Sequence, residues 1–171
     1  FESTGWTFHT TLMPIFARDV LDTDSVGLGW LLFAFGAGAV AASLGWAMIR
    51  DLRHVGKLLI GSVLVWHASI VVFSATSSFY LSMAVLTVTG VGFASMQVFL
   101  LAVLLGNTEA EYRGRVMSLR SLAIYAFAFG SMSSGAMAGF WGAPNAGYIV
   151  GTMGIVMALL LALVAPKLRR L

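Results

Sequence analysis

The stretch Thr108-Glu109-Ala110-Glu111-Tyr112-Arg113-Gly114-Arg115-Val116-Met117-Ser118-Leu119 lies between two long apolar runs, and it decides the fold class. We call residues 108–119 the hinge. It is short and charged, and each flanking run has about 20 or more residues, the length that a helix needs to cross a bilayer. The hinge is therefore expected at a membrane surface, where one helix ends and the next begins.

The composition also indicates a membrane protein. Of the 171 residues, 59% are hydrophobic and 10% are charged, whereas soluble domains carry about 25% charged residues. The apolar runs have no polar face, which argues against a soluble bundle, and the alternation of a membrane β-barrel is missing. The net charge of +3 is concentrated in loops, so no nucleic-acid partner is expected. Without cysteines, no thiolate metal site is expected, and no cofactor is predicted.

The apolar runs predict an all-α integral membrane protein with a single transmembrane domain over residues 1–171. Residues 1–16 reach only about 24 Å at 1.5 Å per residue, so they are interpreted as the latter part of a helix that begins before Phe1. Asp24 or Ser25 is expected to cap the helix that follows. Five further spans are predicted at residues 26–49, 58–75, 79–105, 116–140 and 146–165.

Basic residues are distributed unequally between the two sides of this arrangement. Eight of the ten Lys and Arg residues lie in the loop 50–57, the loop 106–115 and the C-terminal tail. The opposite side holds Arg18 beside three aspartates. Because cytoplasmic loops are rich in Lys and Arg, both loops and the C-terminus are predicted to lie on the cytoplasmic side of the lipid bilayer.

The second and fifth predicted spans share a local pattern. Ala34-Phe35-Gly36 aligns with Ala128-Phe129-Gly130 at an offset of 94 residues. The two spans run in opposite directions, so a true match would make the bundle two inverted three-helix repeats, which is a transporter architecture. Chance similarity between segments rich in small residues explains the match equally well.

The hinge carries a resemblance to a known family. Its residues Glu111-Tyr112-Arg113-Gly114-Arg115-Val116-Met117-Ser118-Leu119 resemble the loop between the tenth and eleventh helices of the major facilitator superfamily. Leu12-Met13-Pro14-Ile15-Phe16-Ala17-Arg18-Asp19-Val20-Leu21 resembles the end of that family's seventh helix, in the branch of the enterobactin exporter and macrolide-efflux proteins. The resemblance implies the C-terminal six-helix half of a twelve-helix transporter, with an N-terminal six-helix half as its partner.

The resemblance also suggests where a small-molecule substrate would pass. Gln97 lies deep in a span, where an unpaired amide is costly, so it should face a cavity or bond another helix. Substrate contact and ordinary helix packing are both open for the pathway candidates, which are Trp6, His9, Met13, Trp30, Phe93, Gln97 and Tyr125. Arg120 is expected to extend to the cytoplasmic surface, and His67 is expected to have a structural role.

Two cytoplasmic loops are candidates for a gate. Arg113 and Arg115 either latch the gate or serve only to set topology, with Gly114 as a tight turn between them. The family's motif in the loop 50–57 matches at Gly56 and Lys57, but Arg53 stands where the motif has an acid. A gating salt bridge through that acid is therefore in doubt.

The function that the resemblance implies is secondary active transport by alternating access. The expected activity is export of amphipathic molecules such as drugs or siderophores, coupled to protons. Because no other acid lies inside a predicted span, the coupling carboxylate is either Glu2 or belongs to the other half.

A half-sized membrane scaffold or non-transporting fragment is the main alternative to a transporter. An intramembrane hydrolase at Ser131-Met132-Ser133-Ser134-Gly135 is remote, because the nucleophile motif lacks its first glycine, and no enzymatic activity is expected.

Overall fold

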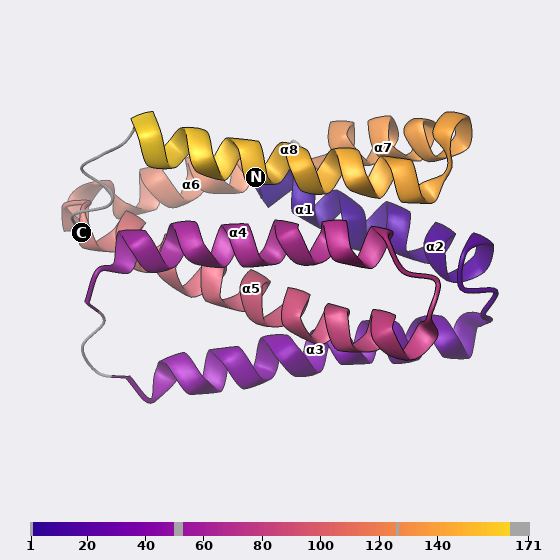
Figure 1. Ribbon diagram of the computed structural model, residues 1–171. Helices are drawn as coiled ribbons and strands as arrows, with labels where there is room; N and C mark the ends of the chain where they lie inside the picture. Colours follow the sequence, from indigo (N-terminus) through magenta and orange to yellow (C-terminus); the bar gives the residue numbers. More distant parts are fainter. Residues whose placement is uncertain (1, 50–52, 126, 165–171) are drawn as a thin grey trace.

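The computed structural model describes residues 2–49, 53–125 and 127–164, and these residues form a bundle of helices that run side by side (Figure 1). No strand occurs within the described ranges. The basic tail, Arg50 and Asp51 lie outside them. The helices are α1 (Glu2–Thr7), η1 (Phe8–Leu12), α2 (Met13–Asp19), α3 (Ser25–Ala47), α4 (Val55–Ser74), α5 (Phe79–Gly106), η2 (Ala110–Tyr112), α6 (Arg113–Tyr125), α7 (Phe127–Trp141) and α8 (Ala143–Val164).

Four of the described helices are long and apolar enough to cross a membrane, namely α3, α4, α5 and α8. They correspond to the predicted spans 26–49, 58–75, 79–105 and 146–165, with ends that differ by a few residues. The predicted span 116–140 is described as two helices, α6 and α7, which flank residue 126. The count of six spans and the inverted repeat therefore stay predictions.

The first helical run is continuous from α1 to α2, but its middle is a π-helix, η1. Pro14 lies at the start of α2 and has no backbone N–H to donate to the preceding turn. The N–H of Met13 bonds to the carbonyl of Phe8, five residues earlier, and this widened turn accommodates the proline. The buried residues Phe8, His9 and Leu12 all lie within η1.

The start of α3 follows the sequence prediction. Asp24 is the N-cap, with extended backbone angles, and its Oδ1 accepts hydrogen bonds from the N–H groups of Val26 (3.1 Å) and Gly27 (2.9 Å). The carboxylate satisfies donors that have no partner inside the helix and lies at the positive end of the helix dipole. This confirms Asp24 as the cap.

Small residues bring the helices together. A Cβ atom on Gly38 of α3 would overlap the backbone of Thr87 in α5, and one on Gly90 of α5 would overlap the backbone of Phe35 in α3. On α8, a Cβ on Gly154 would overlap the ring of His67 in α4. In a bilayer such close backbone approach supplies packing energy that the hydrophobic effect does not. Part of the small-residue strip on α3 is therefore occupied by contact with α5.

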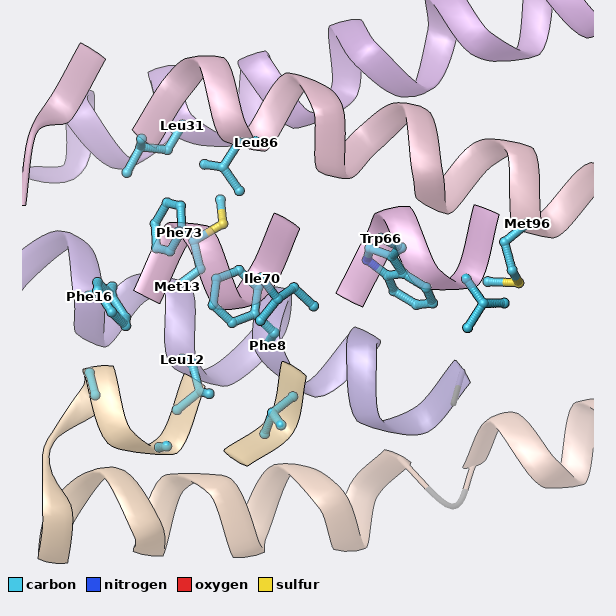
Figure 2. Close-up of a cluster of buried hydrophobic side chains, with 14 of the residues drawn as sticks. Phe8, Leu12, Met13, Phe16, Leu31, Trp66, Ile70, Phe73, Leu86 and Met96 are labelled. Carbon is cyan, nitrogen blue, oxygen red and sulfur yellow. The ribbon is translucent and has the colours of Figure 1, made fainter. Parts of the chain in front are cut away.

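The core lies where the first helical run packs against α4 (Figure 2). Phe8, Met13, Phe16, Trp66 and Phe73 are fully buried there. The ring of Phe73 meets the rings of Phe8 and Phe16 edge to face, with centroids 5.2 Å and 5.0 Å away. These contacts fix the first run within the bundle and thereby place the polar side chains that it carries.

Candidate functional site

Five side chains from the first run, α3, α4 and α5 form what we call the aromatic cluster, namely Trp6, His9, Phe35, Trp66 and Phe93. The rings of Trp6 and Phe93 stack with centroids 5.4 Å apart, and Phe93 also meets Phe35 (5.5 Å) and Trp66 (5.2 Å). The imidazole of His9 lies 4.1 Å from the Phe35 ring and parallel to Trp66. Trp6, Phe35 and Phe93 are partly exposed, so the cluster reaches the surface of this bundle.

His9 is the polar centre of the aromatic cluster. The indole N–H of Trp66 donates to its Nε2 across 3.2 Å. An indole nitrogen only donates, so Nε2 must accept, and the neutral ring then carries its proton on Nδ1. Nδ1 is buried and has no hydrogen-bond partner among the described residues. The cluster therefore contains an N–H donor with unused capacity in an aromatic environment.

One helical turn from the cluster, Glu2, Gln97 and Arg120 form what we call the polar triad. Nη2 of Arg120 donates to Oε1 of Glu2 at 3.0 Å and to Oε1 of Gln97 at 2.5 Å. The side chains of Glu2 and Arg120 are each 19% exposed. The expectation that Arg120 reaches the cytoplasmic surface is wrong, because a carboxylate and an amide oxygen are within reach inside the bundle and compensate its charge there.

The aromatic cluster and the polar triad are adjacent along the first run and α5. Glu2 and Trp6 are four residues apart on the first run, and Phe93 and Gln97 are four residues apart on α5. Residues at this spacing share one face of a helix, so two helices present an aromatic ring and a polar group in the same order. Together they form a strip that changes from aromatic to charged over one turn.

A cavity of about 420 Å³ opens beside the triad. Glu2 and Arg120 line its polar side, and the remaining lining residues are Ser3, Leu100, Leu104, Val116 and Leu119. The cavity therefore has an ion pair on one wall and aliphatic side chains on the other, which is the mixed lining of small-molecule sites.

The other predicted pathway residues lie elsewhere. Met13 is fully buried in the core. Trp30 is 53% exposed, and its ring meets that of Phe33 on the same helix, while Tyr125 is 70% exposed at the end of α6. His67 is buried, with its ring nitrogens near the carbonyl of Val63 (3.0 Å) and Oγ1 of Thr4 (3.3 Å), which agrees with a structural role.

The hinge lies at the end of α5 and the start of α6. Nε of Arg113 donates to the carbonyl of Thr108 at 3.3 Å, and the guanidinium of Arg115 lies 5.6 Å from the Tyr112 ring centre. A Cβ on Gly114 would meet no atom within 4 Å. The start of α4 lies at the same end of the bundle as the hinge (Figure 1). There Arg53 and Lys57 are exposed, whereas Gly56 is buried.

Sequence reasoning missed Phe35 and Trp66 as members of the cluster. Their helices are apolar over their whole length, so the sequence gives no signal of the face that meets His9. Within the described residues, no three His, Cys, Asp or Glu side chains lie close enough together to hold a metal ion.

Comparison with known proteins gives one family. The sequence matches the family model of the Major Facilitator Superfamily over residues 1–170. No curated protein and no solved structure gave a significant match. The matched range covers nearly the whole chain, and the apolar helices agree with an integral membrane protein. The chain belongs to the Major Facilitator Superfamily, a family of membrane transporters and not of enzymes.

Proposed function

We propose that the chain is the C-terminal six-helix half of an exporter for small amphipathic organic molecules such as drugs or siderophores. The observation that carries this proposal is the strip formed by the aromatic cluster and the polar triad, in a chain that matches the family over residues 1–170. Stacked aromatic rings suit the apolar part of such a molecule.

The proposed mechanism is alternating access, in which this half rocks against an N-terminal six-helix half around the strip. Gly36 and Gly45 of α3 support a sliding contact, because a Cβ on either would meet nothing within 4 Å. Trp30 and Tyr125 would meet the other half through their exposed rings. The loops 50–57 and 106–115 and the C-terminus would lie on the cytoplasmic side of a bacterial inner membrane, with Arg113 and Arg115 as a gate latch.

Proton coupling would act through Glu2. Its carboxylate is the one acid of the polar triad and is held by Arg120, which in turn bonds Gln97 on another helix. Proton binding to Glu2 would weaken the ion pair, leave Arg120 with Gln97 alone and so loosen the contact between the first run and α6. A protonation event would in this way become a change in helix packing.

Dye accumulation in bacteria that lack their main efflux pumps tests the proposal. Cells that make the full-length protein should accumulate less of a planar aromatic dye such as Hoechst 33342 than vector controls. Phe93→Ala should raise accumulation, because Phe93 joins three rings of the cluster. Phe140→Ala is the matched control, since Phe140 is 86% exposed on α7. Accumulation equal to the vector control for a range of amphipathic dyes would overturn export, and higher accumulation would reverse its direction.

A further inference from the structure

A groove separates α3 from α4 at the end of the bundle where α4 begins. Both helices pack against α5 (Figure 1), and residues of α5 also line the groove. On the α3 side, the indole N–H of Trp46 donates to Oγ of Ser95 at 2.7 Å, and its ring meets Phe99 at 4.7 Å. This wall is thus fixed by contacts with α5. The groove has a volume of about 270 Å³ and is lined by Trp46, Lys57, Leu58, Gly61, Ser62, Val65, Val91, Gly92, Ser95 and Phe99.

The groove continues along the bundle. A second cavity, of about 340 Å³, lies between α4 and α5 and shares Val65 with the first. From Lys57 to Val72, the two cavities follow α4 over about 22 Å at 1.5 Å per residue. One leaflet of a bilayer has a hydrocarbon thickness of about 15 Å, half of the ~30 Å core. The combined groove is therefore long enough for the acyl chain of a lipid.

The mouth of the groove is cationic. Lys57 lines it from the first turn of α4, and the exposed Arg53 lies just before that helix. The N-cap residue His54 has a left-handed backbone (φ 58°) and forms no side-chain cap hydrogen bond. The first N–H groups of a helix carry partial positive charge and suit an anion such as a phosphate. The apolar groove and the charged mouth call for a ligand that is an acyl chain at one end and an anion at the other.

We propose that this groove is a specific site for an anionic phospholipid, with its phosphate at Lys57 and the start of α4 and an acyl chain along α4 and α5. The site is separate from the polar triad and the aromatic cluster, so the inference goes beyond transport and stands without it. Apart from Lys57, every residue that lines the two cavities is uncharged. Recognition of the headgroup therefore depends on Lys57.

Native mass spectrometry of the detergent-purified protein tests headgroup recognition. Phosphatidylglycerol and phosphatidylcholine with identical acyl chains are added in turn, and inorganic phosphate is added alone. The protein should retain phosphatidylglycerol roughly fivefold more than phosphatidylcholine, the effect expected from one cation near a headgroup. Lys57→Gln should remove this preference and Lys57→Arg should keep it. Arg18→Gln, which removes an exposed cation of α2 that does not line the groove, is the control and should leave the preference unchanged.

A second variant tests the acyl-chain part without altering charge. Gly61 lines the groove and a Cβ there would meet nothing within 4 Å, so Gly61→Leu adds apolar bulk to the groove wall. It should lower retention of both lipids several-fold, whereas Gly139→Leu on α7, where a Cβ is equally unobstructed, should not. Equal retention of the two lipids by the unaltered protein would overturn the site, as would a preference that survives both Lys57→Gln and Gly61→Leu. Tight binding of inorganic phosphate alone would show an anion site without a lipid.

Discussion

Trp66 donates its indole N–H to Nε2 of His9 across 3.2 Å, and this bond places the proton of a neutral His9 on Nδ1. The two residues belong to α4 and to the π-helical segment of the first run, so one bond fixes both the tautomer of His9 and the position of its helix. Gly5 supports this arrangement, because a Cβ there would overlap the Trp66 ring.

Trp66→Phe should release the tautomer of His9 and loosen the core. The loss of one hydrogen bond and of part of a buried ring should lower the free energy of unfolding by about 1–3 kcal/mol. Thermal unfolding in detergent measures the loss, and ¹⁵N shifts of the His9 ring report the tautomer. A proton found on Nε2 in the unaltered protein would contradict the bond.

Glu2 and Arg120 should show strong energetic coupling. Breaking a fully buried pair costs about 3–5 kcal/mol, and this pair is partly exposed, so Arg120→Met alone should cost about 1–3 kcal/mol. Glu2→Gln combined with Arg120→Met should cost less than the sum of the single variants, because neither charge is then left without its partner. Thermal unfolding of the four proteins forms a double-mutant cycle, and additive effects would mean that the pair is not energetically significant.

Gly154→Ala should destabilise the packing of α8 on α4. The added methyl group would overlap the buried ring of His67, which must then move. Overpacking of this kind costs about 1–3 kcal/mol. Gly139→Ala on α7 is the matched control, since its Cβ would meet nothing within 4 Å and alanine favours a helix. The two variants should shift the unfolding temperature in opposite directions.

Asp24→Ala should remove the cap of α3. Two N–H groups lose their acceptor, and the expected loss is about 1 kcal/mol, as for other N-cap substitutions. Ser25→Ala, at the next position, should have a smaller effect because Ser25 lies inside α3 and is exposed. Comparison of their unfolding curves tests this, and equal losses would argue against Asp24 as the cap.

The double variant Arg113→Gln with Arg115→Gln distinguishes between the hinge as a gate latch and the hinge as a topology signal only. If these arginines latch a gate, transport in the full-length protein should fall while insertion into the membrane stays intact. If they serve only topology, cysteine-accessibility labelling should show molecules in both orientations. Lysine at both positions keeps the charge and should preserve topology in either case.

The sequence predicted the positions of the helices better than the side-chain contacts between them. The apolar runs located α3, α4, α5 and α8, and the sequence restricted the cap of α3 to Asp24 or Ser25, of which the structure shows Asp24. Arg120 was misplaced, because a long side chain one turn inside a helix normally extends to the surface, and nothing nearby in the sequence indicates Glu2 as its partner. Trp66 was missed for a different reason, because an apolar helix gives no periodic signal of the face that it turns to His9.

Glu2 and Arg120 are 118 positions apart in the sequence, and this separation determines when their ion pair can form during synthesis. At about 5–20 residues per second, a ribosome needs roughly 6–24 s to make the chain between them. During this interval the first helix can enter the translocon and the bilayer with a carboxyl group whose cation has not yet been synthesised. The pair is therefore a late step of assembly, and it joins the earliest of these helices to the bundle only once α6 has been made.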